Sequence, residues 1–436
     1  MRFHRWTLFL ILLLVTVPSV SAQQQLIVRD NLGLSGLKLT CLGLNCQVGM
    51  NLGDPAGQVF LVTVDSSVNL PSFLSLLLNQ VGVLDAEVNQ ELFLVGATAG
   101  PVPESLLDNT PLTYYGAPVW DGYVNQPAAV IVGVRQTQST FNVAGAGTVA
   151  MIDTGVDTQH PALVPVLVPG YNFINNTPNG SEMGDVNESS VAVLDGGSPE
   201  PALVNSSTIA VVNESTVAVL DGGPYSAFGH GTMTAGIVHL VAPQANIMPL
   251  KAFSADGSGY VSNIIRATYY AVQHNAKVLS MSFSFSPSSG EMAKAINYAN
   301  SRGVICVASA GNDGTDVLVY PAALNHVMGV ASTTDYDTRS SFSNYGTDVW
   351  VAAPGEGVIS TYPWGSYAAG WGTSFSAPFV SGTAALLVNV SANVDQQSAA
   401  GAIANAKPIS SEGMGNGLLD TYMAVQSWVI TAGQQR

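Results

Sequence analysis

The chain has 436 residues, of which 47% are hydrophobic and only 10% are charged. This balance excludes a mainly disordered chain, and the length predicts one domain of about 250–300 residues with a smaller one beside it. With 13 basic residues against 29 acidic ones, the formal charge of −16 argues against a protein that tracks nucleic-acid phosphates. Three cysteines are too few for a disulfide scaffold.

The N-terminus has the three-part pattern of a secretory signal peptide. Arg2 and Arg5 precede the apolar run 8–17, and Val20-Ser21-Ala22 supplies small residues for cleavage. The run is too short to anchor a mature protein, and no later stretch reaches about 18 uninterrupted apolar residues. We therefore expect residues 1–22 to be removed and the mature protein to be secreted without a membrane span, into the medium or into the periplasm of a double-membrane bacterium.

Residues 23–118 are predicted to form a separate first unit. Short β-branched stretches predict strands over 26–29 and 58–64, a helical apolar patch covers 73–78, and alternation returns over 83–95. A small α+β domain of about 80 residues fits this pattern. Residues 100–118 hold four prolines and are predicted to be a linker. Cys41 and Cys46 either pair or remain two free thiols.

From about Gln126 onwards, predicted strands alternate with predicted helices. Strands are expected over 148–152, 247–253, 278–283 and 304–308, and helices over 232–240, 261–274, 291–301 and 375–390. Such alternation predicts an α/β fold in which helices cover both faces of a parallel sheet. Functional residues then gather at the carboxyl ends of the strands.

A duplicated acidic insertion at about 182–223 interrupts the alternation. VNESSVAVLDGG at 186–197 and VNESTVAVLDGG at 212–223 agree at eleven of twelve positions. From 136 to 250 the chain has nine acidic residues and no lysine or arginine. The insertion could attract basic substrates, bind calcium through its carboxylates, or be a solvated flap without a function of its own.

Three short motifs could carry catalysis. Asp153 closes an apolar strand within Ile-Asp-Thr-Gly, His230 lies in Gly-His-Gly-Thr, and Ser374 lies in Gly-Thr-Ser-Phe-Ser-Ala-Pro at a helix start. A serine hydroxyl needs a base, and a histidine serves as one when a carboxylate holds its tautomer. Asn312 follows a buried strand and could donate its amide to an oxyanion.

These motifs, in this order, resemble the subtilisin-like serine proteases over about 126–425. The resemblance implies a catalytic triad of Asp153, His230 and Ser374, with Asn312 in the oxyanion hole. It also implies a subtilisin-like peptidase domain at 119–430 and makes residues 23–118 a propeptide with its linker, cleaved between Gly100 and Asn125. The expected protein is a secreted, self-processing serine endopeptidase whose partners are protein or peptide substrates and its own propeptide.

The resemblance also implies a substrate pocket. Its walls would be Ser282, Phe283, Ser284, Ala308, Ser309, Ala310 and Gly311. These walls carry no charge, and Asp313 would lie at the rim, so we expect broad specificity with an apolar preference. Ser284 replaces a glycine found in many relatives, and should narrow the pocket. No cofactor is required, although the family allows structural calcium; the usual calcium loop after the histidine helix is missing.

Other interpretations compete with this hypothesis. A catalytically silent relative would act as a binding or surface protein. The serine-carboxyl peptidases share the fold but use a glutamate in place of the histidine, and Gly229-His230-Gly231 argues against them. An α/β-hydrolase esterase needs Gly-x-Ser-x-Gly, which is absent at Ser374. Asp157 and His160 lie near Asp153 but lack a third metal ligand nearby, and Cys306 lies in an apolar strand that predicts an inert core position.

Overall fold

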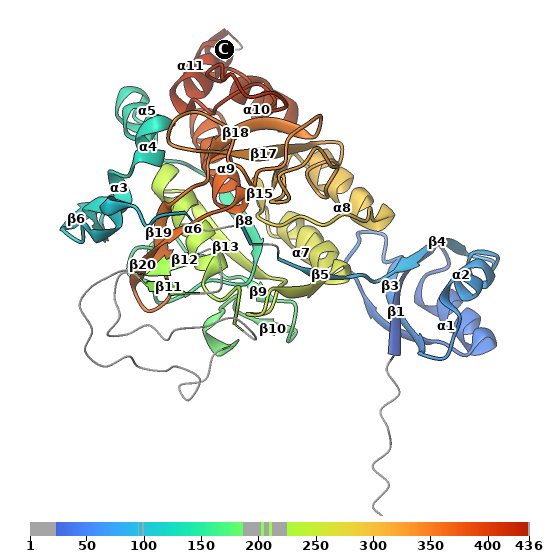
Figure 1. The fold of residues 1–436 in the computed structure, drawn as a ribbon. Helices are drawn as coiled ribbons and strands as arrows, with labels where there is room; N and C mark the ends of the chain where they lie inside the picture. The colour runs from blue at the N-terminus through green and yellow to red at the C-terminus, as the bar shows by residue number, and fades with distance from the viewer. Residues whose placement is uncertain are drawn as a thin grey trace, which may run out of the picture.

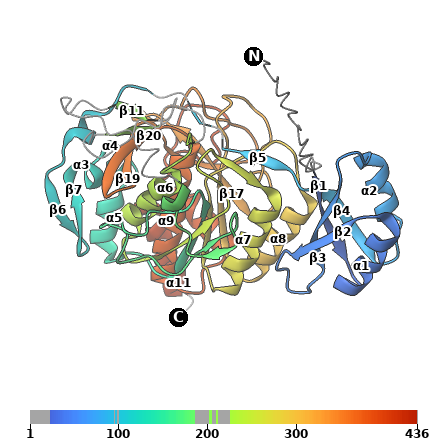
Figure 2. The ribbon, with the colours of Figure 1, turned by 90° about the horizontal axis from the view of Figure 1, so that it is seen from below.

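A computed structural model describes residues 23–94, 96–97, 100–185, 202–204, 209–211 and 225–434. The expected signal peptide and both full copies of the repeat lie outside these residues. The described chain forms a small N-terminal unit, set to one side, and a larger α/β body (Figure 1). Figure 2 shows the same two parts from below, with the N-terminal unit lying beside α7 and α8 of the body.

The N-terminal unit is a four-stranded antiparallel sheet with two helices. Its strand order is β2-β3-β1-β4. The elements are β1 (Gln23–Asp30), α1 (Gly33–Leu44), β2 (Gln47–Asn51), β3 (Val59–Asp65), α2 (Leu70–Leu78) and β4 (Val83–Val88). The helices and sheet enclose an apolar core that includes Leu26, Phe60 and Leu77. The structure pairs Cys41 with Cys46 in a disulfide, at the end of α1.

The segment predicted as a linker is largely built into the body. Its elements are η1 (Glu104–Leu107), β6 (Pro111–Tyr114) and β7 (Ala117–Trp120). Before it comes β5 (Glu91–Phe93), and after it come α3 (Asp121–Val124), α4 (Pro127–Ile131) and α5 (Val134–Phe141). Tyr114 and Tyr123 donate their hydroxyls to the Leu240 and Gly236 carbonyls at 2.6 Å each. The linker prediction is wrong over 104–118, because Pro111 and Pro118 lie within the strands of a β-hairpin whose Tyr114 is buried against the body.

The main sheet has eight strands in the order β10-β9-β13-β8-β15-β16-β17-β18. Its strands are β8 (Thr148–Asp153), β9 (Tyr171–Asn172), β10 (Thr177–Pro178), β13 (Asn246–Lys251), β15 (Val278–Met281), β16 (Ile305–Ser309), β17 (Val327–Thr333) and β18 (Val349–Pro354). All neighbours are parallel except β10 and β9. The central strands are buried on both faces, which explains their continuous apolar sequence.

Helices cover both faces of this sheet, as predicted. The helices are α6 (His230–Val241), α7 (Val261–Gln273), α8 (Gly290–Ser301), α9 (Thr373–Val390), α10 (Gln396–Ile403) and α11 (Thr421–Gln434). One apolar core contains residues of α6, α9 and α11, and a second contains residues of α7 and α8. Among the described helices, α9 alone is long and apolar enough to cross a membrane, and 89% of it is buried in the protein.

A second sheet, ordered β11-β12-β20-β19, lies beside the main one. It comprises β11 (Ala202–Val204), β12 (Ile209–Val211), β19 (Val358–Tyr362) and β20 (Ser366–Gly370). The two short strands β11 and β12 belong to the insertion, and β12 pairs antiparallel with β20, which leads into α9. The remaining short elements are η2 (Met183–Asp185) and β14 (Ser258–Tyr260). The insertion is thus attached to the element that precedes Ser374.

Candidate active site

Asp153 and His230 meet at the carboxyl end of the main sheet. Nδ1 of His230 lies 2.7 Å from Oδ1 of Asp153. Asp153 is 2% exposed, and its carboxylate also accepts from the Thr154 N–H at 2.7 Å and from the Thr234 hydroxyl at 3.0 Å. Burial lowers the pKa of His230, but the charge and hydrogen bond of Asp153 outweigh it, so the pKa lies above its ordinary value.

Glycines on either side of His230 allow this approach. Gly229 has φ +86°, a conformation that side chains rarely adopt, and a Cβ there would also meet the ring of Tyr362. A Cβ on Gly231 would collide with the carbonyl oxygen of Gly155, in the loop that follows Asp153. The Gly-His-Gly sequence therefore lets the start of α6 lie directly against the end of β8.

Ser374 lies in the first turn of α9 and is 8% exposed. Its hydroxyl donates to the Ser282 carbonyl at 3.0 Å; the described residues show no hydrogen bond from it to His230. The ring of Phe375, the next residue, lies 5.6 Å from that of His230. The helix start directs free N–H groups and the positive end of the helix dipole towards this serine.

Asn312 lies beside the same helix start. Its Oδ1 accepts from the Thr373 N–H and the Thr373 hydroxyl, both at 2.9 Å. Nδ2 of Asn312 would lie 3.3 Å from a Cβ added to Gly372, so the amide nitrogen lies next to the residues that precede Ser374. The structure thus brings together all four residues singled out from their motifs.

The predicted pocket residues fall into two facing segments. Ser282, Phe283 and Ser284 follow β15, while Ser309, Ala310 and Gly311 end or follow β16. A Cβ on Gly311 would lie 3.3 Å from Oγ of Ser284, so the segments approach closely there. Ala308 packs with Phe283 in the core beneath. Asp313 is exposed at the rim and accepts from the Asn344 amide at 3.2 Å.

Sequence reasoning missed two buried charged residues behind this site. Glu182 is fully buried and contacts Thr154, Gly229 and Thr232. Lys251 is also fully buried, and its Nζ donates to Asp185 Oδ2 and the Thr154 carbonyl at 2.6 Å each. Only the presence of an acid at the border of the insertion could have pointed to Glu182, because its partners are distant in sequence.

The structure gives Asp157 and His160 structural roles. Asp157 Oδ2 accepts from the Trp364 N–H at 2.9 Å, and Nε2 of His160 lies 3.0 Å from the Ser366 carbonyl oxygen. Within the described part of the chain, no group of three or more His, Cys, Asp or Glu is placed to hold a metal ion. Cys306 is buried in the core, and burial raises the pKa of its thiol to about 12.

A parallel α/β body that presents a histidine–aspartate pair beside a serine at a helix start defines a serine peptidase. The subtilase family model matches residues 145–420. Thermitase of Thermoactinomyces vulgaris is 33% identical over 306 residues, which make up 67% of this chain and 93% of thermitase. Subtilisin Savinase of Lederbergia lenta is 39% identical over 168 residues, covering 36% of this chain and 62% of that protein.

Solved structures agree with this assignment. A protease of Pseudoalteromonas arctica superimposes with a TM-score of 0.55 at 26% identity, covering 68% of this chain and 94% of that one. A lanthipeptide protease has the same fold, with a TM-score of 0.54 and 23% identity over 69% of this chain and 95% of that one. The chain belongs to the subtilase family and is a subtilisin-like serine endopeptidase.

Proposed function

We propose that Ser374 is the nucleophile, His230 the general base and acid, and Asp153 the residue that orients His230. The 2.7 Å contact between His230 and Asp153 carries this proposal, because it leaves Nε2 of the ring for the serine proton. The test is peptide hydrolysis by Ser374→Ala, which should be lost. Retained turnover would contradict the assignment and favour a different nucleophile.

In the proposed reaction, Ser374 Oγ attacks the scissile carbonyl carbon while His230 takes its proton. The carbonyl oxygen becomes an oxyanion, which the Ser374 N–H and the Asn312 amide hold. His230 then gives the proton to the leaving amine, and water repeats the sequence on the acyl-enzyme. Asp153 stays ionised and stabilises the imidazolium. These steps use no cofactor.

We propose broad specificity with an apolar preference at the residue before the cut. The facing segments Ser282–Ser284 and Ser309–Gly311 carry no charged side chain. Asp313 is exposed and hydrogen-bonded to Asn344, so it does not supply a buried charge for lysine or arginine. A peptide library cut only after basic residues would contradict this.

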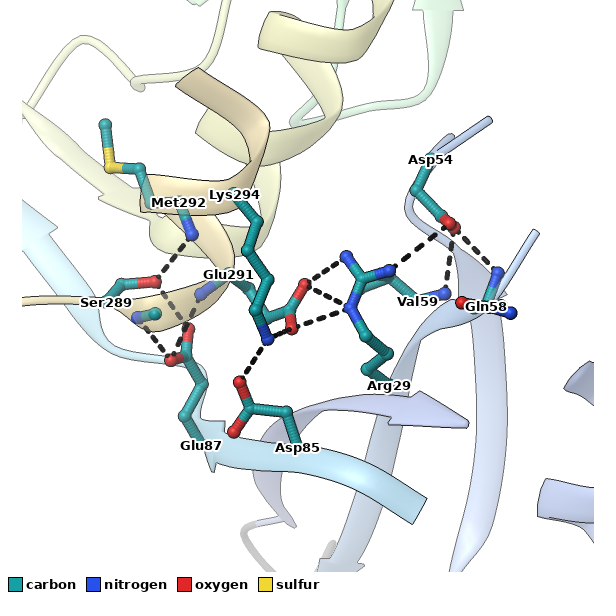
Figure 3. Close-up of polar contacts among 11 residues, drawn as sticks. Arg29, Asp54, Gln58, Val59, Asp85, Glu87, Ser289, Glu291, Met292 and Lys294 are labelled. Atoms are coloured by element: carbon teal, nitrogen blue, oxygen red, sulfur yellow. Dashed lines mark hydrogen bonds and ion pairs between the residues drawn. The ribbon is translucent and has the colours of Figure 1, made fainter. Parts of the chain in front are cut away.

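The N-terminal unit is proposed to be a propeptide that docks on α8 (Figure 3). Arg29 makes a two-pronged contact with Glu291, at 2.9 Å and 2.7 Å, and Lys294 bridges Asp85 and Glu291 at 2.6 Å and 2.7 Å. Glu87 accepts from the Gly290 N–H at 2.8 Å, at the start of α8. Such paired charges at a helix start favour specific docking.

The chain that leaves this unit runs into the active site. β5 pairs antiparallel with β14, and the Leu94 N–H donates to the Gly257 carbonyl at 2.9 Å. Ala97 is buried, and its Cβ would lie 3.8 Å from a Cβ added to Gly372. Gly372 is two residues before Ser374. We therefore propose that self-cleavage occurs between 94 and 97, ahead of the expected Gly100–Asn125, and that the peptidase unit begins before 119.

Secretion and a zymogen pathway complete the proposal. The signal-peptide pattern of residues 1–22 supports export, and the docked first unit supports an inactive precursor.

The acidic insertion is proposed to alter access to the site, since β12 pairs with β20. Replacing 186–221 by a short Gly-Ser segment tests this. If the variant cleaves basic and neutral substrates in the same ratio as the wild type at low salt, the insertion does not attract basic substrates to the site.

A further inference from the structure

Glu182 occupies a fully enclosed position behind the proposed catalytic pair. It is 0% exposed and belongs to the segment that enters the insertion. Its Oε2 accepts from the Gly229 N–H at 2.9 Å and the Thr154 hydroxyl at 3.0 Å. Its Oε1 accepts from the Thr232 N–H at 3.3 Å and from the Thr232 hydroxyl. Four donors around one carboxylate satisfy a buried anion.

These donors surround His230 in the sequence and in space. Gly229 precedes it and Thr232 follows it by two residues, while Thr154 directly follows Asp153. The Thr154 hydroxyl also accepts from the Gly231 N–H at 2.9 Å. One side chain therefore ties the end of β8 to the first turn of α6, the two elements that must align for the 2.7 Å contact between Asp153 and His230.

Several charged or titratable groups surround Glu182. They are the proposed catalytic pair Asp153 and His230, the ion pair of Lys251 and Asp185, and the Tyr362 phenol. Burial raises the pKa of Glu182 to about 7, although the Thr232 hydroxyl, Lys251 and Gly229 oppose this. The charge of Glu182 in turn adds to that of Asp153 in raising the pKa of His230.

Building on the proposed catalytic roles, we propose that Glu182 is a positioning residue for His230. Its carboxylate holds the first turn of α6 against the end of β8, and its negative charge adds to that of Asp153 in stabilising the imidazolium formed during turnover. Glu182 contacts neither substrate nor Ser374, so it acts through His230. The insertion is thereby anchored at its N-terminal end directly behind the active site.

The test is kcat and KM of Glu182→Gln as a function of pH, expressed per active site titrated with a serine-directed probe. The amide keeps the volume and removes the charge. At pH 8, where Glu182 is ionised, we expect kcat to fall about tenfold with KM unchanged. We expect the acid limb of kcat/KM to move to lower pH, because neutral His230 then persists to lower pH. Asp348→Asn is the matched control, since Asp348 is a half-buried carboxylate whose pKa burial also raises.

A merely structural Glu182 would change the number of active sites but leave kcat per site and the acid limb at wild-type values, which would overturn the proposal. If Glu182→Gln yields no titratable sites, Glu182→Asp decides instead. It keeps the charge but shortens the side chain, so kcat per site should fall several-fold with the acid limb in place; an unchanged kcat would overturn the proposal. Activity in Ser374→Ala would instead refute the proposed catalytic roles.

Discussion

The hydroxyl of Ser374 donates to the carbonyl oxygen of Ser282 at 3.0 Å. In the proposed reaction this hydroxyl must turn to Nε2 of His230, so the contact describes a resting state. A neutral hydrogen bond of this kind contributes about 1 kcal/mol, which is small beside a catalytic barrier. The two segments that meet here, the strand end of β15 and the first turn of α9, are the ones that must stay aligned for catalysis.

Removing the proposed nucleophile or base should abolish turnover. Ser374→Ala and His230→Ala should each lower kcat by about 10⁶, the loss known for subtilisin, another member of this family. Asn312→Ala should cost about 10²–10³ with KM nearly unchanged, because its amide acts on the transition state. Steady-state kinetics on a chromogenic peptide measure all three, and similar losses in all three variants would contradict the separate role of Asn312.

Self-processing should depend on Ser374. In a host without other proteases, the wild-type precursor should yield a new N-terminus between 95 and 97, while Ser374→Ala should keep the N-terminal unit attached. N-terminal sequencing and intact mass measure both. A fully processed Ser374→Ala protein would show that another protease makes the cut, and a wild-type N-terminus beyond Ala97 would contradict the proposed position.

Propeptide docking should depend on Arg29. Arg29→Ala leaves the Glu291 side chain, which is 0% exposed in the docked form, with Lys294 as its remaining charged partner among the described residues. We expect the inhibition constant of the propeptide for mature enzyme to rise at least about tenfold. Lys38→Ala is the control, because Lys38 is exposed on α1 and should leave inhibition unchanged. Equal effects of both substitutions would argue against a specific Arg29 contact.

Acid should destabilise the fold through His239 on α6. This residue is 1% exposed, and neither ring nitrogen has a hydrogen-bond partner among the described residues. Burial lowers the pKa of His239 to about 4, from 6.5 when unfolded. The stability it contributes is therefore present above pH 6.5 and is lost as the pH falls through 4, up to about 3 kcal/mol.

His239→Leu should remove this dependence. Urea unfolding of Ser374→Ala protein, used to avoid self-digestion, should show a smaller loss of stability between pH 7 and pH 4 when His239→Leu is added. At pH 4 the double variant should have a clearly higher free energy of unfolding than Ser374→Ala alone. At pH 8 the two free energies should be nearly equal. An identical pH dependence with and without His239→Leu would exclude this residue as the source.

The sequence predicted the main sheet well, because local pattern and tertiary structure agree there. Buried parallel strands have continuous apolar runs, so the strand ends carrying Asp153 and Asn312 could be found. The helix at 33–44 was not predicted, because its exposed face carries leucines and it lacks a polar stripe. The hairpin at 111–120 was missed because its prolines suggested a linker.

Long-range partners explain the rest of what could not be predicted. The carboxylate of Glu182 accepts hydrogen bonds from Thr154, Gly229 and Thr232, which lie 28, 47 and 50 positions away in the sequence. No sequence periodicity relates these positions. Likewise, Arg29 meets Glu291 across 262 positions. Such contacts follow from the folded sheet and not from local sequence, so only the structure shows them.

Covalent labelling of the active serine tests the central claim most directly. A fluorophosphonate probe should attach once per molecule of mature enzyme, at Ser374 in the peptide map, with loss of activity in step with labelling. Ser374→Ala should not be labelled, and His230→Ala only slowly, because the serine then lacks its base. Label on another residue, or full peptidase activity in protein completely labelled at Ser374, would contradict the account.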